Sequence, residues 1–387
     1  MTSGPIAILF LIDYFHRTGG TEKHLAQLIT GLSPQEFRAT VVAFDLGENP
    51  LLDELRQRGI PIIHLPVGRE YVPNALRQAW RLSRLVHRQR FDIVQTYHQK
   101  ADTFGALIVW LAGVRHLISS KRDTGDLRKP LHRFLNRHLQ HLFERFIMVA
   151  EGVRSAVVAR DQLPPERVVT IYNGVDTERF RPPTVQERHA ARARLGLESG
   201  DAVVGMVAGF RPEKNYEVFF AAAERVVATM PNLRVLAVGT GELLPTFRDR
   251  LASSPLGPRT IFAGEVTDVR PWLWAMDVGC LTPGSNEGFS NAVIEQMAVG
   301  LPMIVTAVGG NAEAVVDGET GRVIAPGDSA AAAAALTSLF ADPARLQGMG
   351  RAARRRAEEH FSVHGMCAAH ARLYAALAGR RAETTAP

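Results

Sequence analysis

One stretch of the chain, residues 281–310, limits the possible folds more than any other. It reads LTPGSNEGFSNAVIEQMAVGLPMIVTAVGG. The apolar run VGCL that leads into it is typical of a buried strand, and the turn formers Pro283-Gly284-Ser285-Asn286 end that strand. A helix is then expected from about Ser290 to Gly300, with Pro302 just beyond its end, before the apolar run LPMIVTAV returns as a strand. The stretch therefore predicts a strand–helix–strand unit of an open α/β sheet.

Two acidic residues of this unit, Glu287 and Glu295, are candidate ligand-binding groups. The first lies in the loop and the second about a turn and a half into the helix, so both can face one site beside the helix N-terminus. Open α/β sheets bind ligands at the carboxyl ends of their strands, and a helix N-terminus suits a phosphate. Because carboxylates repel phosphate, we expect the two acids to accept hydrogen bonds from ribose and sugar hydroxyls, which favours a sugar nucleotide. Taken singly, each acid also fits an ordinary helix residue, with Glu287 complementing the helix dipole.

The longer string SNEGFSNAVIEQMAVGLPMIVTAVGGNAEAV resembles the donor-site signature of retaining glycosyltransferases of family four, which have the GT-B fold. In that signature seven residues separate two glutamates, as they separate Glu287 and Glu295 here. The resemblance implies two doubly wound, Rossmann-like α/β domains that face each other across a cleft. It also implies transfer of a sugar from a UDP- or GDP-linked donor with retention of the anomeric configuration.

Length and composition fit a two-domain enzyme of this kind. A chain of 387 residues is too long for one ordinary core. Its two cysteines, Cys280 and Cys367, provide no disulfide framework and favour a reducing cytoplasm. The first residues, MTSGPIAILFLIDYF, carry no basic segment and predict a first strand rather than a signal peptide. No apolar run approaches the roughly 18–20 residues of a membrane-spanning helix.

The domain limits follow from the pattern of turns and linkers. We expect an acceptor-binding domain over residues 1–180 and a nucleotide-sugar-binding domain over residues 181–360. A polar, charged segment that follows Asn173-Gly174-Val175-Asp176 marks the connection between them. The last helix, within residues 361–380, resembles the helix that crosses back to the first domain in GT-B proteins.

The second predicted domain carries most of the expected donor contacts. Its first strand is followed by Arg211-Pro212-Glu213-Lys214, and two cations at a strand's carboxyl end can neutralise a diphosphate. A solvated loop would also carry such residues, but the sequence is similar to the phosphate clamp of family four. The resemblance further implies Gly264, Glu265 and Val266 as the base-binding loop. It implies donor contacts from Gly288, Phe289, Ser290 and Asn291 as well as from the two glutamates.

The first predicted domain adds a glycine turn, Gly19-Gly20-Thr21-Glu22, after its first strand. Paired glycines let a backbone approach a ligand, although a plain tight turn needs them equally. In family four a GG-x-E turn at this place reaches the donor phosphates, which implies Gly19 and Gly20 as donor contacts.

Candidate acceptor-side residues follow two later strands of the first domain. They are His98 and Lys100 in one loop, and Arg122 and Asp123 in another. Family members often have a histidine one position before His98, where this chain has Tyr97. They often have another histidine in the second loop, which reads Ser119-Ser120-Lys121-Arg122-Asp123 here.

The expected chemistry is stabilisation of a departing nucleoside diphosphate, with Arg211, Lys214 and Glu287 as the catalytic residues. No cluster of carboxylates and histidines suggests a metal, so we expect neither a metal nor any other cofactor. One rival is a sugar-nucleotide epimerase of the same fold, which would need an acid/base pair and no acceptor. Another is a non-catalytic, basic binding protein, but the arginines are scattered, and we expect no nucleic acid partner.

A net charge of +6 suits anionic partners, including a membrane surface. Apolar residues at helical spacing occur between residues 127 and 146: Leu131, Phe134, Leu135, Leu139, Leu142, Phe143 and Phe146. Basic residues lie between them: Arg128, Lys129, Arg133, Arg137 and Arg145. This stripe could face a core, or it could form a surface for an anionic membrane. We therefore expect a cytoplasmic protein that acts on a glycan or lipid-linked acceptor in cell-surface polysaccharide or glycolipid synthesis. If the stripe faces a membrane, the protein is peripheral on its inner face.

Overall fold

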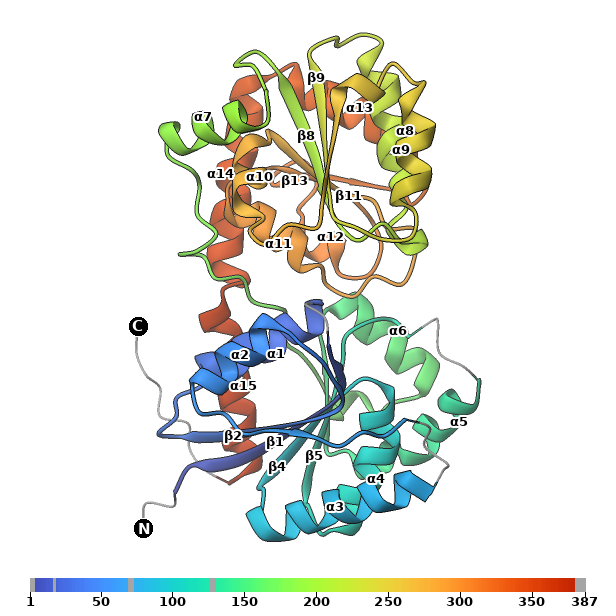
Figure 1. Cartoon of the computed structure of the whole chain (residues 1–387), viewed down its shortest axis with the longest axis vertical. Coiled ribbons are helices and arrows are strands. Elements are labelled where there is room, and N and C mark those ends of the chain that lie inside the picture. The colour runs from blue at the N-terminus through green and yellow to red at the C-terminus, as the bar shows by residue number, and fades with distance from the viewer. Residues whose placement is uncertain (1–3, 17–18, 69–72, 126–129, 380–387) are drawn as a thin grey trace. The chain divides into compact units, whose positions relative to one another are not determined.

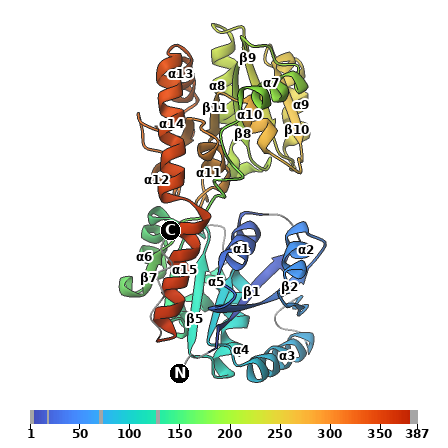
Figure 2. The same ribbon diagram turned by 90° about the vertical axis from the view of Figure 1, so that its left-hand side faces the viewer.

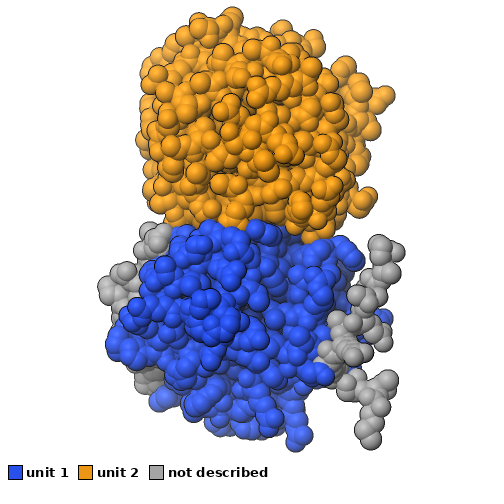
Figure 3. All heavy atoms as spheres, turned by 180° about the vertical axis from the view of Figure 1, so that it is seen from behind, with its two compact units in different colours: residues 1–174, 363–387 blue, residues 175–362 orange. Residues whose placement is uncertain are grey.

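The computed structural model describes residues 4–16, 19–68, 73–125 and 130–379 (Figure 1). The chain forms two compact units (Figure 3). The first contains residues 1–174 together with residues 363–387, and the second contains residues 175–362. The limits expected from the sequence are residues 180 and 360. Each unit contains a parallel sheet with helices on it, so the predicted α/β class with two Rossmann-like domains is confirmed.

The first unit is built on a seven-stranded parallel sheet in the order β3-β2-β1-β4-β5-β6-β7. Its strands are β1 (Ile6–Phe15), β2 (Phe37–Leu46), β3 (Ile62–His64), β4 (Ile93–Tyr97), β5 (His116–Lys121), β6 (Arg145–Met148) and β7 (Val168–Thr170). The central strand β1 is an almost unbroken apolar run and is buried along nearly its whole length, as expected for a parallel strand covered on both faces. The order reverses between β1 and β4, which makes this pair the switch point of the sheet.

The helices of the first unit are α1 (Gly20–Gly31), α2 (Pro50–Gln57), α3 (Pro73–Gln89), α4 (Ala106–Leu111), α5 (Pro130–Leu139), α6 (Glu151–Asp161) and α15 (Val363–Leu377). A π-helical turn, Ala101–Gly105, precedes α4. The last helix, α15, packs against α1 (Figure 2). Its Met366, Cys367 and Tyr374 belong to the same core as β1. The C-terminal segment is therefore an integral part of the first unit.

The second unit has a six-stranded parallel sheet in the order β10-β9-β8-β11-β12-β13. Its strands are β8 (Ala202–Val207), β9 (Leu233–Val238), β10 (Thr260–Gly264), β11 (Val278–Leu281), β12 (Met303–Thr306) and β13 (Gly321–Ile324). Its helices are α7 (Val185–Arg194), α8 (Tyr216–Val227), α9 (Leu244–Ala252), α10 (Arg270–Ala275), α11 (Asn291–Ala298), α12 (Asn311–Ala314), α13 (Ser329–Phe340) and α14 (Pro343–His360). The predicted strand–helix–strand unit is confirmed as β11, α11 and β12.

The basic stripe between residues 127 and 146 is helical in its first part only, so the helical spacing predicts too long a helix. Helix α5 ends at Leu139, a short 3-10 turn covers Gln140–Leu142, and Arg145–Met148 form strand β6. Phe143 and Phe146 are buried, because they pack where β6 enters the sheet. Arg128 and Lys129 lie outside the described residues. In the part of the chain that is described, no helix has the length and apolar character needed to span a bilayer.

Candidate functional site

The switch point of the second sheet lies between the neighbouring parallel strands β8 and β11. From β8 the chain continues to one side of the sheet, through β9 and β10, and from β11 it continues to the other, through β12 and β13. Connections that leave in opposite directions open a crevice at the carboxyl ends of these two strands, and ligands of such sheets bind there. Arg211 and Lys214 follow β8, and Glu287 follows β11. The topology therefore brings the predicted cations and the first predicted acid to one place.

An ion pair joins the loops that follow these two strands. Nζ of Lys214 lies 2.5 Å from Oε2 of Glu287, and both side chains are largely buried, with 14% and 11% exposed. The backbone carbonyl of Glu213 accepts a hydrogen bond from the N–H of Gly284 at 3.0 Å. Nε of Arg211 lies 3.2 Å from Oε1 of Glu213, and the Arg211 side chain is about half exposed. Lys214 is thus fixed by its carboxylate partner, whereas Arg211 keeps its outer face toward solvent.

A third loop, after β12, supports the backbone of Glu287. Gly309 has φ +55°, and a Cβ at this position would lie 2.0 Å from the carbonyl oxygen of Glu287. The N–H of Gly310 donates to the carbonyl of Gly288 at 2.6 Å. Only glycine fits at residue 309, because both the positive φ and the close approach exclude a side chain. Sequence analysis did not assign a role to Gly309 or to Glu213.

Helix α11 begins directly after this loop. Ser290 is its N-cap residue, and the Ser290 side chain makes no capping hydrogen bond. The start of α11 carries the positive end of the helix dipole. Phe289 is buried, with its ring centroid 5.1 Å from that of Phe361. Glu295 lies within α11 and is also buried. These positions are compatible with the predicted donor contacts of residues 287–291 and Glu295.

The predicted base-binding residues lie along the same edge of the sheet. Gly264 is the last residue of β10, has φ +68°, and its carbonyl accepts from the N–H of Gly239 at 2.9 Å. Glu265 and Val266 follow it. Because β10 is two strands from β8 in the sheet order, this loop is displaced from the Lys214–Glu287 pair along the carboxyl edge.

The glycine turn of the first unit begins α1 after strand β1. Gly19 is the N-cap residue of α1, and Gly20 is its first helical residue. A Cβ at Gly19 would lie 2.4 Å from Oε2 of Glu22, so the Glu22 carboxylate folds back over the start of the helix. Gly19 and Gly20 therefore occupy the carboxyl side of the switch point between β1 and β4.

His98 and Lys100 follow β4 on the other side of that switch point. The His98 ring stacks on Tyr14, with centroids 4.4 Å apart, and its backbone has φ +69°. Nζ of Lys100 donates to the carbonyl oxygens of Val67 at 3.3 Å and Gly68 at 2.7 Å. Two of the three N–H bonds of the ammonium are therefore directed at backbone.

Asp13, near the end of β1, is a buried carboxyl group that sequence analysis missed. It accepts hydrogen bonds from the backbone N–H groups of Lys100 at 2.8 Å and Ala101 at 2.7 Å. Burial raises the pKa of Asp13 to about 7, and the two N–H donors oppose that rise. Since the partners are 87 and 88 residues away in sequence, only the pairing of β1 with β4 reveals this contact.

Arg122 and Asp123 follow β5, the next strand along. The Arg122 guanidinium donates a hydrogen bond to Oδ1 of Asn173. Burial lowers the pKa of Arg122 to about 10, while the nearby Tyr97 and Asp123 favour its charged form. The four predicted acceptor-side residues therefore lie after the adjacent strands β4 and β5.

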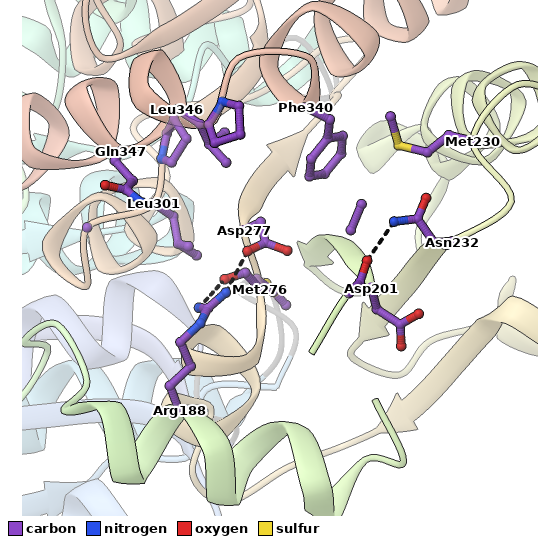
Figure 4. Close-up of a pocket in the computed structure, with 15 residues that line it drawn as sticks. Arg188, Asp201, Met230, Asn232, Met276, Asp277, Leu301, Phe340, Leu346 and Gln347 are labelled. Atoms are coloured by element: carbon purple, nitrogen blue, oxygen red, sulfur yellow. Dashed lines mark hydrogen bonds and ion pairs between the residues drawn. The ribbon is translucent and has the colours of Figure 1, made fainter. Parts of the chain in front are cut away.

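A pocket of about 500 Å³ in the second unit lies elsewhere (Figure 4). Its lining includes Asp201, Asp277 and Pro302, which directly precede β8, β11 and β12, so it lies at the amino ends of the strands. Arg188 is paired there with Asp277 at 2.5 Å, and the Asn232 amide donates to the carbonyl of Gly200 at 2.6 Å (Figure 4). These polar groups bond to one another and are not part of the switch-point site. Within the described ranges, no group of three or more His, Cys, Asp or Glu side chains could hold a metal ion.

Comparison with known proteins identifies the family. A family model described as "Glycosyl transferases group 1" matches residues 201–342, and a second, "Glycosyltransferase Family 4", matches residues 18–179. A D-inositol 3-phosphate glycosyltransferase 2 of Catenulispora acidiphila is 33% identical over 304 residues, which cover 72% of this chain and 68% of that protein. The chain belongs to glycosyltransferase family 4.

Two further proteins are similar to this family 4 glycosyltransferase. The lipopolysaccharide core biosynthesis mannosyltransferase LpsB of Rhizobium meliloti is 30% identical over 214 residues, which cover 54% of this chain and 60% of LpsB. The chain thus spans less than two thirds of the length of that relative. The crystal structure of Anabaena HepE in complex with UDP has a TM-score of 0.85 and 21% identity, and the match covers 95% of this chain and 99% of HepE. That likeness establishes the fold, which is the GT-B fold predicted from the sequence.

Proposed function

We propose that this family 4 glycosyltransferase transfers a sugar, with retention of configuration, from a UDP- or GDP-linked donor to a glycan or lipid-linked acceptor. The observation that carries this proposal is the Lys214–Glu287 ion pair at the switch point of the second sheet, in the region of Arg211 and the N-terminal end of α11. Anabaena HepE, which shares the fold, has been solved with UDP and with UDP-glucose, and this supports a nucleotide-sugar donor.

The chemistry at this site follows from the charges that develop during transfer. Departure of the nucleotide leaves negative charge on the diphosphate and positive character on the sugar. Lys214 has three N–H donors, so its contact with Glu287 leaves donors for a phosphate oxygen. Arg211 can add bidentate contacts, and the first N–H groups of α11 add a third source of positive potential. The three groups together stabilise the leaving diphosphate without a metal.

The two acids bind different parts of the donor in this proposal. Glu287, held against Lys214, accepts hydrogen bonds from the sugar hydroxyls at the reacting end. Glu295, farther along α11, accepts from the ribose. The loop at Gly264, Glu265 and Val266 contacts the base, and Gly19 and Gly20 contact the phosphates.

The acceptor is assigned to the first unit, at the carboxyl ends of β1, β4 and β5. His98, Lys100, Arg122 and Asp123 line this edge, and they can bind hydroxyl and anionic groups. We place the reaction in cell-surface polysaccharide or glycolipid synthesis on the cytoplasmic side of the membrane. The relatives of Catenulispora acidiphila and Rhizobium meliloti, named for an inositol phosphate and for lipopolysaccharide core synthesis, are compatible with an acceptor rich in hydroxyl and phosphate groups.

A donor panel tests the proposal. UDP- and GDP-sugars are added singly at increasing concentration, and the melting temperature is followed. A donor present at about 100 times its Kd should stabilise the protein by about 2.7 kcal/mol. The stabilising donor is then incubated with candidate acceptors, and nucleotide release is measured. Release that depends on the acceptor supports transfer. An altered sugar without any acceptor would indicate an epimerase instead, and no stabilisation by any nucleotide sugar would refute the proposal.

A further inference from the structure

The first unit exposes an unusual concentration of large apolar side chains on two helices. In the described part of the chain, the exposed large hydrophobic side chains are Leu76, Trp80, Leu107, Trp110, Leu111, Phe134 and Val185. Five of these seven belong to α3 and α4. Single exposed apolar residues are ordinary, but a concentration that includes two tryptophans marks an interaction surface.

Helix α3 exposes its apolar residues although it already has a separate buried face. Leu76 is 77% exposed and Trp80 is 60% exposed, and they lie four residues apart on one face. Leu82 and Val86, on the other side of the helix, are buried in the unit. The two exposed side chains are therefore not needed to hold α3 in place.

Helix α4 repeats this arrangement next to α3. Leu107, Trp110 and Leu111 are exposed by 39%, 46% and 68%, and their spacing of three and four residues places them on one face. Ile108 and Val109 between them are buried. The two helices pack against each other, and both views of the ribbon show them side by side (Figures 1 and 2).

The charges on these helices all have one sign. Arg77, Arg81, Arg84 and Arg88 of α3 are exposed, and neither helix contains an aspartate or a glutamate. The guanidinium carbon of Arg84 lies 5.1 Å from the centroid of the Trp80 ring, a cation–π contact that places cation and indole together. The exposed side chains of α3 and α4 named here form what we call the α3–α4 surface.

We propose that the α3–α4 surface docks this protein onto the surface of an anionic lipid bilayer. Tryptophan favours the boundary between lipid headgroups and hydrocarbon because its ring is apolar and its N–H is polar. Leucines beside it can enter the hydrocarbon, while surrounding arginines contact anionic headgroups. The combination fits the layered chemistry of a bilayer surface.

A second copy of the chain fits this surface less well. In a two-fold symmetric dimer the same patch lies on both subunits. The arginines of α3 would then lie close to the arginines of the other copy, without acids on either helix to balance them. Like charges opposed across an interface are destabilising. The charge pattern therefore favours an anionic partner, and the two exposed tryptophans favour a lipid surface among such partners.

This inference goes beyond the transfer reaction and does not depend on it, because lipid binding is measured without donor or acceptor. The surface suggested by the sequence alone centred on residues 127–146 and included the arginines between Arg77 and Arg90, and the structure adds the exposed tryptophans and leucines of α3 and α4. The guanidinium of Arg137 in α5 is hydrogen-bonded to the side chain of Gln162, whereas the α3–α4 surface joins cations to exposed tryptophans.

The test is flotation of the full chain with vesicles of neutral phosphatidylcholine, with or without anionic phosphatidylglycerol, at low and high salt. We expect binding to the anionic vesicles, weaker binding at high salt, and little binding to neutral ones. The loss of one arginine that lies close to the membrane surface should weaken vesicle binding about fivefold. Replacement of Arg77, Arg81 and Arg88 with glutamine should therefore reduce the affinity roughly a hundredfold. Trp80→Ser with Trp110→Ser should abolish the binding that remains at high salt.

Matched variants separate docking from general charge and hydrophobicity. Replacement of Arg345, Arg351 and Arg355 of α14 with glutamine removes the same charge from exposed positions of the second unit, and Val185→Ser removes an exposed apolar group there. Both should bind as wild type does, and Arg137→Gln should lower binding less than twofold. Equal binding to neutral and anionic vesicles, an equal loss in the α14 variant, or no binding would overturn the proposal. Sedimentation that shows a dimer dissociated by Trp80→Ser, without vesicle binding, would assign the surface to a second copy instead.

Discussion

The ammonium of Lys214 and the carboxylate of Glu287 form an ion pair across the switch point of the second sheet, with Nζ and Oε2 2.5 Å apart. The two residues come from loops after the adjacent strands β8 and β11, and both are largely shielded from water. Removing one member of a buried pair leaves the other charge uncompensated. The pair therefore affects both the stability of the two loops and the positive charge that is available to the donor. Mutation can separate a loss of stability from a loss of activity.

The first prediction concerns the cations. Lys214→Ala and Arg211→Ala should each reduce the turnover number by about a hundredfold or more, because each removes positive charge from the leaving diphosphate. Lys214→Ala should also lower the melting temperature, since Glu287 is then left as an unpaired buried carboxylate. The exposed Arg211 should have little effect on stability. Initial rates and thermal unfolding of the purified variants check both statements.

A double variant and a control make the first prediction specific. Lys214→Met combined with Glu287→Gln removes both charges, so it should recover most of the lost melting temperature while the rate stays low. Arg351→Ala, an exposed arginine of α14, should leave both quantities unchanged. If Lys214→Ala and Arg211→Ala kept the donor affinity and rate of wild type, the assignment of the cations to the diphosphate would fail.

The second prediction separates the two acids. Glu295→Gln should weaken binding of the free nucleoside diphosphate and of the donor to a similar degree, because the ribose is common to both. Glu287→Gln should weaken binding of the donor much more than binding of the free nucleotide. Titration calorimetry with each ligand measures the two ratios. If both variants affected free nucleotide equally, the division of roles would be refuted.

The parts of this structure that could be predicted from sequence depend on local patterns. The strand–helix–strand unit around residues 281–310 was predicted correctly because turn formers, a helix stop and two apolar runs all occur within 30 residues. The helix expected within residues 127–146 is shorter than its apolar spacing suggests, because Phe143 and Phe146 continue that spacing by chance and belong to a strand region. In a short apolar run, periodicity alone does not distinguish a helix from a strand.

The contacts that define the site could not be predicted in this way because they depend on strand order. Lys214 and Glu287 are 73 residues apart, and only the pairing of β8 with β11 brings them together. The pairing of β1 with β4 likewise brings Asp13 close to the backbone N–H groups that donate to its carboxylate. The role of Gly309 depends on a carbonyl 22 residues earlier in the chain, at Glu287. Local patterns in the sequence point to candidate site residues, but the partners of these residues depend on how the strands are ordered.

The third prediction is that activity survives chelation. The proposed stabilisation of the diphosphate uses Arg211, Lys214 and the N–H groups of α11, so no step requires a metal ion. EDTA at millimolar concentration should leave the initial rate nearly unchanged. Complete loss of activity that added magnesium or manganese restores would show that a cation takes part.

The fourth prediction concerns a buried ion pair in the first unit. Oδ2 of Asp102 lies 2.5 Å from Nζ of Lys121, and Oδ1 accepts from the hydroxyls of Thr96 at 2.5 Å and Ser119 at 2.8 Å. Asp102→Asn and Lys121→Met should each reduce the free energy of unfolding by about 3–5 kcal/mol, because the remaining charge is buried without its partner. Urea unfolding monitored by circular dichroism measures the loss.

Two comparisons check this interpretation of the Asp102–Lys121 pair. The double variant should lose clearly less than the sum of the single losses, since neither charge remains. Asp53→Asn breaks an exposed pair with Arg56, and this should cost less than about 1 kcal/mol. Additive losses in the double variant would mean that the two side chains do not depend on each other.

The last prediction concerns acid and His370 of α15. Burial, with a smaller contribution from the nearby Arg122, lowers the pKa of His370 from its ordinary value of 6.5 to about 4, although the hydrogen bond between its Nδ1 and the carbonyl of Met366 opposes this shift. As the pH falls below 6.5, the unfolded chain binds the proton first, so the contribution of the neutral ring to stability is lost progressively toward pH 4.

His370→Gln cannot bind that proton. The free energy of unfolding of wild type, relative to the variant, should therefore fall by about 3 kcal/mol between pH 7 and pH 4. Asp13 is present in both proteins, so its own titration largely cancels in this difference, whereas the variant also loses the effect by which His370 lowers the pKa of His24. Urea unfolding of the two proteins at several pH values gives the result, and a difference independent of pH would show that His370 does not titrate in the folded protein as its burial requires.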